Sequence, residues 1–327
     1  MKTIALTIIA GLMLVAGCQV DVAGQVAAPS PDNVNAAVKA GQRALLARQR
    51  PDGSWVDNAE GFPGGPSALA AWALLECCNS PEEPKMVSAL AYLQGLRTDK
   101  TYTVAIRANV WAAAERLQPG RFGNDLRVDT ERLFRHSIRG AYSYVTTQGC
   151  SDITDQSNSH YGVLGVQAAI GSKVAIPREY WQDVRKYWLD MQNVDGGWPY
   201  SRKGTPTSAT MTVAGIATLQ LCQEQLGAAG SVPKTADPAL AAAIGRGLAW
   251  VDANFQATLK DPQVLYYYFL SIDRLGRTSG RTQLGGVDWK AAVTAELIRR
   301  QNPDGTWDGP WGKDVSTAYA LLVLARK

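Results

Sequence analysis

The sequence has few of the residues on which metal sites and thiol or imidazole chemistry depend. Among 327 residues there are two histidines and five cysteines, and no two cysteines form a C-x-x-C pair. We therefore predict no metal ion and no cofactor. Beyond the N-terminal region the cysteines are Cys77, Cys78, Cys150 and Cys222, which we expect to be buried apolar side chains rather than disulfide partners.

An excess of charge of either sign is also missing. Lys and Arg total 33 against 29 for Asp and Glu, and no basic stripe or block of like charge stands out. No nucleic-acid partner is therefore predicted.

Long apolar runs are absent except near the start. Residues 4–15 follow Lys2 and are fewer than the ~20 that a membrane-spanning helix needs, so they resemble the core of a signal peptide. The next residues, Val15-Ala16-Gly17-Cys18, resemble a bacterial lipobox, which implies an exported envelope protein anchored to the membrane by a lipid on Cys18. An ordinary signal peptide cleaved near Ala23-Gly24 is the alternative. We predict a signal peptide over 1–18, a flexible tether over 19–32 and one domain over 33–327.

A repeated motif is the clearest feature that is present. It combines Gln, Asp-Gly and Trp at fixed spacing in three segments: Gln49-Arg50-Pro51-Asp52-Gly53-Ser54-Trp55, Gln192-Asn193-Val194-Asp195-Gly196-Gly197-Trp198 and Gln301-Asn302-Pro303-Asp304-Gly305-Thr306-Trp307. Gln94, Gln148 and Gln256 mark weaker copies, so the glutamines recur at intervals of about fifty residues, a period typical of a helical-hairpin repeat.

The chemistry of the motif indicates a structural role. A Gln at a helix end can satisfy backbone groups that have no partner within the helix, and Asp-Gly forms a tight turn. The indole that follows would pack over neighbouring hairpins. We therefore interpret Gln49, Trp55, Gln192, Trp198, Gln301 and Trp307 as structural clamps.

Apolar periodicity predicts about twelve helices in alternating outer and inner positions. The outer candidates carry charges on one face and cover 34–48, 84–96, 125–145, 177–191, 238–255 and 288–300. The inner candidates are rich in Ala, Gly and Ser and cover 66–78, 102–117, 157–170, 206–226, 262–275 and 315–325. Six such hairpins predict an all-α fold, a closed (α/α)6 toroid.

At these motifs the chain resembles a known family. The Q-x-x-D-G-x-W segments, with Thr317-Ala318-Tyr319-Ala320-Leu321-Leu322 after the last one, are similar to the QW repeats of squalene cyclases and protein prenyltransferase β subunits. Asp155-Gln156-Ser157-Asn158-Ser159-His160-Tyr161 resembles a segment of exported single-toroid bacterial proteins of the prenyltransferase/squalene-oxidase repeat family. The resemblance covers the whole predicted domain and implies the toroid.

The sequence lacks the motifs on which the known activities of that family depend. The D-x-D-D acid of class II cyclases is absent, and Asp152-Ile153-Thr154-Asp155 lacks its central pair. Only five Phe occur, and most Trp fall in the clamps or outer helices, so an aromatic-lined cyclase cavity is not expected. No cysteine follows an Asp at the D-x-C spacing of the prenyltransferase zinc site, and Ile153 stands where a thioester partner of Cys150 would need Gln.

Other α/α toroids are polysaccharide lyases and glycosidases, and this alternative remains open. Gly196-Gly197-Trp198-Pro199-Tyr200 faintly resembles a segment of one pectate lyase family, although its D-N-x-A-T segment has no clean match.

In such a toroid the first turns of the inner helices surround a central funnel, where we expect any site. The residues placed there are Ser67, Tyr102, Arg107, Asp155, Asn158, His160, Tyr161, Thr207, Thr210, Tyr266, Tyr267 and Asp314. Asp155, His160 and Asp314 are the candidate catalytic residues, and the others are candidate ligand contacts. The alternative for Asp155 and Asp314 is helix capping without catalysis.

Three functions follow as hypotheses. The first is binding of an apolar or isoprenoid-like small molecule in the funnel, without the standard cyclase acid or prenyltransferase zinc. The second is a polysaccharide lyase or glycosidase acting on a glycan, and the third is a non-enzymatic envelope scaffold.

Overall fold

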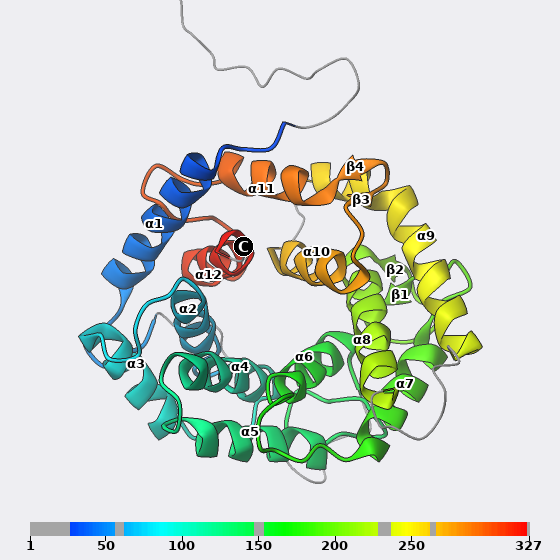
Figure 1. Ribbon diagram of the computed structural model, residues 1–327, viewed down its shortest axis with the longest axis horizontal. Helices are drawn as coiled ribbons and strands as arrows, with labels where there is room; N and C mark the ends of the chain where they lie inside the picture. Colours follow the sequence, from blue (N-terminus) through cyan, green and yellow to red (C-terminus); the bar gives the residue numbers. More distant parts are fainter. Residues whose placement is uncertain (1–26, 56–61, 147–153, 228–236, 262–265, 326–327) are drawn as a thin grey trace, which may run out of the picture.

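The computed structural model describes residues 27–55, 62–146, 154–227, 237–261 and 266–325, and within them it confirms the predicted toroid of six helical hairpins (Figure 1). The outer helices are α1 (Pro31–Arg48), α3 (Pro84–Gly95), α5 (Gly123–Arg135), α7 (Arg178–Met191), α9 (Pro238–Lys260) and α11 (Trp289–Arg299). The inner helices are α2 (Gly65–Glu76), α4 (Thr101–Leu117), α6 (Gln156–Gln167), α8 (Ala209–Gly227), α10 (Tyr266–Ser279) and α12 (Lys313–Leu324).

The inner helices form a closed ring. Each packs against the next inner helix along the chain, and α12 packs against α2 to complete the circle (Figure 1). The outer ring closes at the same seam, because α1 contacts both α11 and α12.

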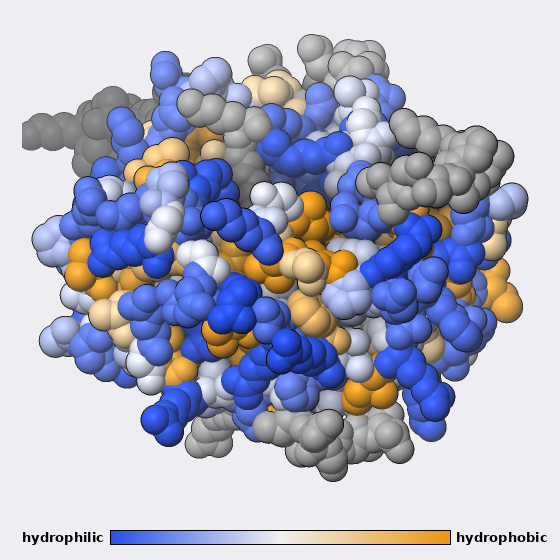
Figure 2. Space-filling model, turned by 60° about the horizontal axis from the view of Figure 1, so that its bottom comes forward, coloured by the Kyte–Doolittle hydropathy of each residue, from blue (hydrophilic) through white to orange (hydrophobic). Residues whose placement is uncertain are grey.

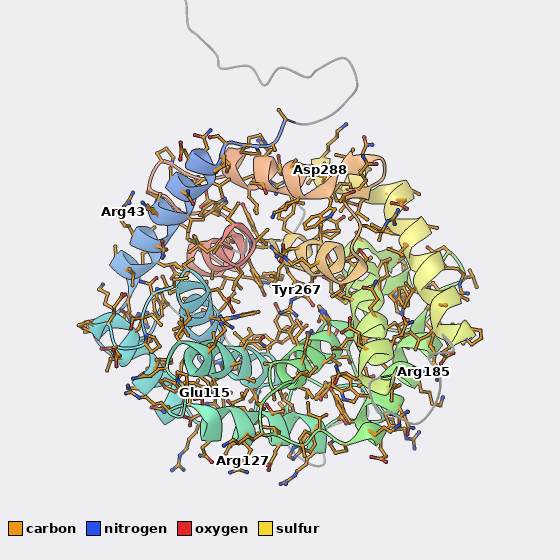
Figure 3. All side chains as sticks on the ribbon, viewed as in Figure 1. Arg43, Glu115, Arg127, Arg185, Tyr267 and Asp288 are labelled. Atoms are coloured by element: carbon orange, nitrogen blue, oxygen red, sulfur yellow. The ribbon has the colours of Figure 1, made fainter. Side chains whose placement is uncertain are left out.

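Side-chain pattern explains which helices lie inside. In α2 every residue from Gly65 to Leu75 is buried, and its small side chains allow close packing on all sides. In α7 only one stripe is buried, including Trp181 and Trp188, as expected of a helix with one face in water. Arg43, Arg127 and Arg185 point outward from the outer ring (Figure 3), and the surface is mainly hydrophilic with apolar residues visible between (Figure 2).

The three Q…DG…W segments make the same set of bonds. Each Gln amide donates to the carbonyl of its own turn glycine and to a carbonyl of the next outer helix: Lys85 for Gln49, Ala243 for Gln192 and Ala37 for Gln301. Each indole Nε1–H donates to the preceding outer helix: Trp55 to Leu45, Trp198 to Trp188 and Trp307 to Leu297. Each Trp backbone N–H donates to a hydroxyl of the following inner helix: Ser67, Thr212 or Thr317. One motif thus joins three helices.

The glycine of this turn is required for two reasons. Gly53, Gly196 and Gly305 have φ of 87°, 93° and 84°, a left-handed conformation that suits glycine. A Cβ on Gly53 or Gly196 would also lie 2.3 or 2.7 Å from a carbonyl oxygen of the next outer helix.

One predicted helix is too long. Instead of covering 125–145, α5 ends at Arg135, and the chain turns back at Arg139 and Gly140, both with positive φ. It then runs beside the start of α4, where the Thr101 N–H donates to the Tyr144 carbonyl. The start of α8 also differs, because Thr207–Ser208 (β2) pairs with Trp198–Pro199 (β1). A second short ladder joins Gln283–Leu284 (β3) to Val287–Asp288 (β4).

Several expectations fall outside the described residues or need correction. Cys18, the proposed cleavage site, Gln148, Cys150 and the predicted start of α10 at 262–265 lie outside them. Cys222 is buried and Cys77 half-buried, but Cys78 is exposed, because it follows the end of α2 with φ of 66°. No helix in the described part of the chain is long and apolar enough to span a membrane.

Candidate ligand-binding site

A cavity of about 500 Å³ lies within the ring at the N-terminal ends of the inner helices. Its walls come from α2, α4, α6, α10 and α12 and from the segments that precede α2, α6, α8 and α12. The lining residues are Phe62, Gly65, Pro66, Leu69, Tyr102, Ile106, Tyr144, Asp155, Ser157, Tyr161, Tyr200, Tyr267, Pro310, Trp311, Gly312, Val315 and Tyr319. Figure 3 shows Tyr267 directed toward the middle of the ring.

Aromatic rings form a continuous wall in this cavity. The ring centroids of Tyr102 and Tyr161 lie 4.6 Å apart, and Tyr161 stacks on Tyr267 at 5.0 Å. Tyr319 extends the row beyond Tyr267, at 6.1 Å. On the other side Phe62 meets the edge of Tyr102 at 5.5 Å. The expectation that aromatics are too few to line a cavity was therefore wrong, because it counted Phe and Trp and overlooked tyrosine.

The tyrosine hydroxyls are largely occupied by one another and by α6. Tyr161 and Tyr319 share a hydrogen bond between their hydroxyls, and Tyr102 donates to Ser157. Burial raises the pKa of Tyr102, Tyr161 and Tyr267 well above the usual value of 10.0. These phenols therefore stay neutral at physiological pH and hold the aromatic rings in place.

Among the described residues that line the cavity, Asp155 is the only charged one. It is the N-cap of α6, and its Oδ1 accepts from the Asn158 N–H at 2.9 Å, the Asn158 Nδ2 at 3.0 Å and the Ser157 hydroxyl. Its Oδ2 accepts no hydrogen bond from the described residues. Asp155 is thus both a helix cap and a carboxylate with one oxygen available to a ligand.

His160 lies on the far side of the aromatic row. Its Nδ1 shares a hydrogen bond with the Tyr267 hydroxyl, and its Nε2 is buried without a hydrogen-bond partner. Burial, with a further contribution from the charge of Arg274, lowers the pKa of His160 to about 3, so the imidazole is neutral. It borders a second cavity of about 310 Å³, at the C-terminal ends of the inner helices, which has polar walls that include Glu76, Arg116 and Arg277.

Four residues predicted for the funnel point elsewhere. Arg107 faces outward and binds both oxygens of Asp129 in α5, at 2.7 and 2.6 Å. Asp314 pairs with Arg48 of α1 and does not line the cavity. Ser67 of α2 and Thr207 of β2 bond to the repeat turns instead: Ser67 accepts from the Trp55 N–H, and Thr207 donates to Asp195.

Three others lie near the cavity without lining it. Asn158 turns toward Asp155, and its own Oδ1 is buried without a partner. Thr210 lies beside Tyr200, one of the lining residues. Tyr266 packs edge-on against Phe269, with its centroid 5.9 Å away, and lies beside Arg300.

Five aromatic residues of the lining were not predicted: Phe62, Tyr144, Tyr200, Trp311 and Tyr319. Tyr144 was placed in a helix that ends before it. Tyr319 carries a usable signal, because it follows Val315 by one helical turn on α12, and both side chains face the cavity. Phe62, Tyr200 and Trp311 lie in loops that periodicity does not describe.

Among the described residues, no group of three or more His, Cys, Asp or Glu is arranged to hold a metal ion. The fold and the cavity together define a single α/α toroid with an aromatic-lined central site.

Solved structures of similar fold include a cyclase and glycan-active enzymes, while no family model and no curated protein matches the sequence. The α-1,6-mannanase of Salegentibacter sp. HEL1_6 is 8% identical over 89% of this chain and 98% of its own, with a TM-score of 0.66. The type II terpene cyclase MstE of Scytonema is 15% identical over 91% of this chain and 98% of its own, with a TM-score of 0.55. The β-1,3-1,4-glucanase of Paenibacillus sp. X4 is 9% identical over 91% and 94%, with a TM-score of 0.58. At these identities the likeness concerns the fold alone.

Proposed function

We propose that this protein binds an apolar, isoprenoid-like small molecule in the aromatic-lined cavity of the toroid. The observation that carries the proposal is the composition of the wall, where eight of the seventeen described lining residues are aromatic and one is charged. A volume of about 500 Å³ lies within the range of small-molecule sites. The fold shared with a terpene cyclase is compatible with such a ligand.

We further propose that the protein acts at the cell envelope, anchored by a lipid on Cys18, as the N-terminal sequence predicts. A membrane-anchored toroid would meet apolar ligands at the lipid surface, where they concentrate. Mass spectrometry of the N-terminal peptide, with Cys18→Ala as the control, tests the anchor separately from ligand binding.

The proposal is tested by organic extraction of the purified protein followed by mass spectrometry, and by titration with farnesol. Trp311 lines the cavity and is 52% exposed, so ligand entry should change its fluorescence. We expect saturable binding of farnesol to the wild type. The Trp311→Phe variant should still bind farnesol, but without the change in Trp311 fluorescence. The proposal would be refuted if calorimetry detected no binding of farnesol and farnesol did not compete with an extracted molecule.

Glycan binding is the second candidate, favoured by the higher TM-scores to the mannanase and the glucanase. Aromatic faces also suit the apolar faces of sugars. However, hydrolysis needs a pair of carboxyl groups across the scissile bond, and only Asp155 is present among the described lining residues. Saturable binding of a mannan or glucan oligosaccharide, with no binding of farnesol, would favour this candidate instead.

A further inference from the structure

We propose that the ligand of the aromatic-lined cavity carries a positive charge, as an ammonium or related onium head group on an apolar body. The inference rests on the proposed function, because it concerns the same cavity. It adds the electrostatic class of the ligand, which neither the fold nor the similar structures assign.

The distribution of charge in the wall is the first argument. Among its described residues the cavity has one carboxylate, from Asp155, and no Lys, Arg or His. A diphosphate or carboxylate head group is normally bound by Arg or Lys, which supply charge-assisted hydrogen bonds. An anionic ligand would therefore meet only like charge from a side chain here.

The position of Asp155 is the second argument. As N-cap of α6 its carboxylate lies at the positive end of the helix dipole and offsets the attraction of that end for an anion. The three hydrogen bonds that Asp155 accepts from described residues all end on Oδ1, which leaves Oδ2 as the oxygen that would face a ligand. A cation beside Oδ2 would gain an ionic partner already fixed in place by the helix.

The rings around this carboxylate supply the third argument. Tyr144 and Tyr200 line the same cavity as Asp155, and the charge of Asp155, after burial, contributes to raising the pKa of both phenols. Tyr144 lies 6.4 Å from Tyr102 and 6.0 Å from Phe62 between ring centroids. Neutral aromatic faces attract a cation through the negative potential of the ring face, and quaternary ammonium ions are commonly bound by such cages.

The test compares three head groups on one tail: farnesyl-trimethylammonium, farnesol and farnesoate. Calorimetric titration of the full chain should give an affinity order of ammonium, alcohol, then carboxylate, with the ammonium at least about tenfold tighter than the alcohol. Asp155→Asn should remove most of this preference, because Asn keeps the cap but carries no charge. Asp288→Asn is the matched control, because Asp288 caps α11 outside the cavity.

A second pair of variants separates charge recognition from folding. Tyr144 is 47% exposed, so neither variant should disturb the core. Tyr144→Phe should retain the ammonium preference, whereas Tyr144→Leu should reduce it several-fold. Equal affinity for ammonium and alcohol, or tightest binding of farnesoate, would overturn the inference and leave the proposed function standing. Failure of all three to bind would overturn both.

Discussion

At the scale of the residue, two carboxylates with similar positions have different tasks. Asp155 and Asp314 both lie at the start of an inner helix. Asp155 caps its own helix and reaches the cavity, whereas Asp314 turns away to pair with Arg48 of α1. A place at the start of an inner helix therefore does not determine the role. Asp155 is the N-cap of α6, whereas Asp314 is the second residue of α12, and this shift of two positions turns the side chain toward different neighbours.

The buried His160 should make the free energy of unfolding depend on pH in the acid range. Its folded pKa is about 3, against 6.5 for the free side chain, so the unfolded chain takes up a proton first as pH falls. The stabilisation is fully present above pH 6.5 and is lost as pH falls toward 3. We expect His160→Gln to flatten the fall of unfolding free energy over that window, measured by urea denaturation at several pH values.

The half-buried His136 provides the control for this measurement, because it is the only other histidine. His136→Gln should leave the pH dependence close to that of the wild type. A His160→Gln variant with an unchanged slope would show that His160 does not carry the effect.

At the scale of the element, the repeat turn is the unit that fixes one hairpin against the next. Its Gln bonds to the next outer helix and its Trp to the preceding one, while the carbonyl of its Gly accepts from the Gln. The loss of any one therefore affects more than its own loop. The turn glycine allows backbone strain and steric conflict to be separated. Gly196 and Gly204 have φ of 93° and 87°, but only Gly196 lies against another backbone.

We expect Gly204→Ala to lower the free energy of unfolding by about 1–2 kcal/mol, the cost of an alanine in the left-handed region. Gly196→Ala should cost clearly more, because its Cβ would lie 2.7 Å from the Arg246 carbonyl oxygen. Urea unfolding of both variants measures the difference. Equal costs would mean that α9 moves aside without penalty.

At the scale of the whole molecule, Gln301 joins the last hairpin to the first. Its amide donates to the Ala37 carbonyl of α1, 264 residues away along the chain. Gln301→Ala leaves two carbonyl groups without that donor and should cost about 1–3 kcal/mol. Hydrogen exchange should accelerate mainly in α1, where the seam opens.

Gln94→Ala is the comparison, because Gln94 makes only an exposed bond, to Asp125 at 2.9 Å. The free energy of unfolding of Gln94→Ala should stay within about 0.5 kcal/mol of the wild-type value. If Gln301→Ala were equally neutral, with unchanged exchange in α1, closure would depend on apolar packing alone.

The arrangement of the whole ring could be predicted from the sequence more completely than the binding site could. The ring was predictable because Gln, Asp-Gly and Trp have demanding geometry and recur at regular spacing. The site was only partly predictable, because an inner helix such as α4 is buried nearly all round and has little apolar pattern to show which face looks inward. Tyr102 and Ile106 face the cavity, and Arg107, one residue further on, faces α5.

The seam between α12 and α2 also bears on how such a protein can change its size. An open solenoid lengthens by adding repeats and ends in capping repeats with a polar outer face. In a closed hoop every hairpin has two neighbours, and a seventh would have to force all the others to new angles. The number of repeats is therefore fixed, and variation is directed into the loops at the ends of the inner helices, which are the segments that shape the mouth of the cavity.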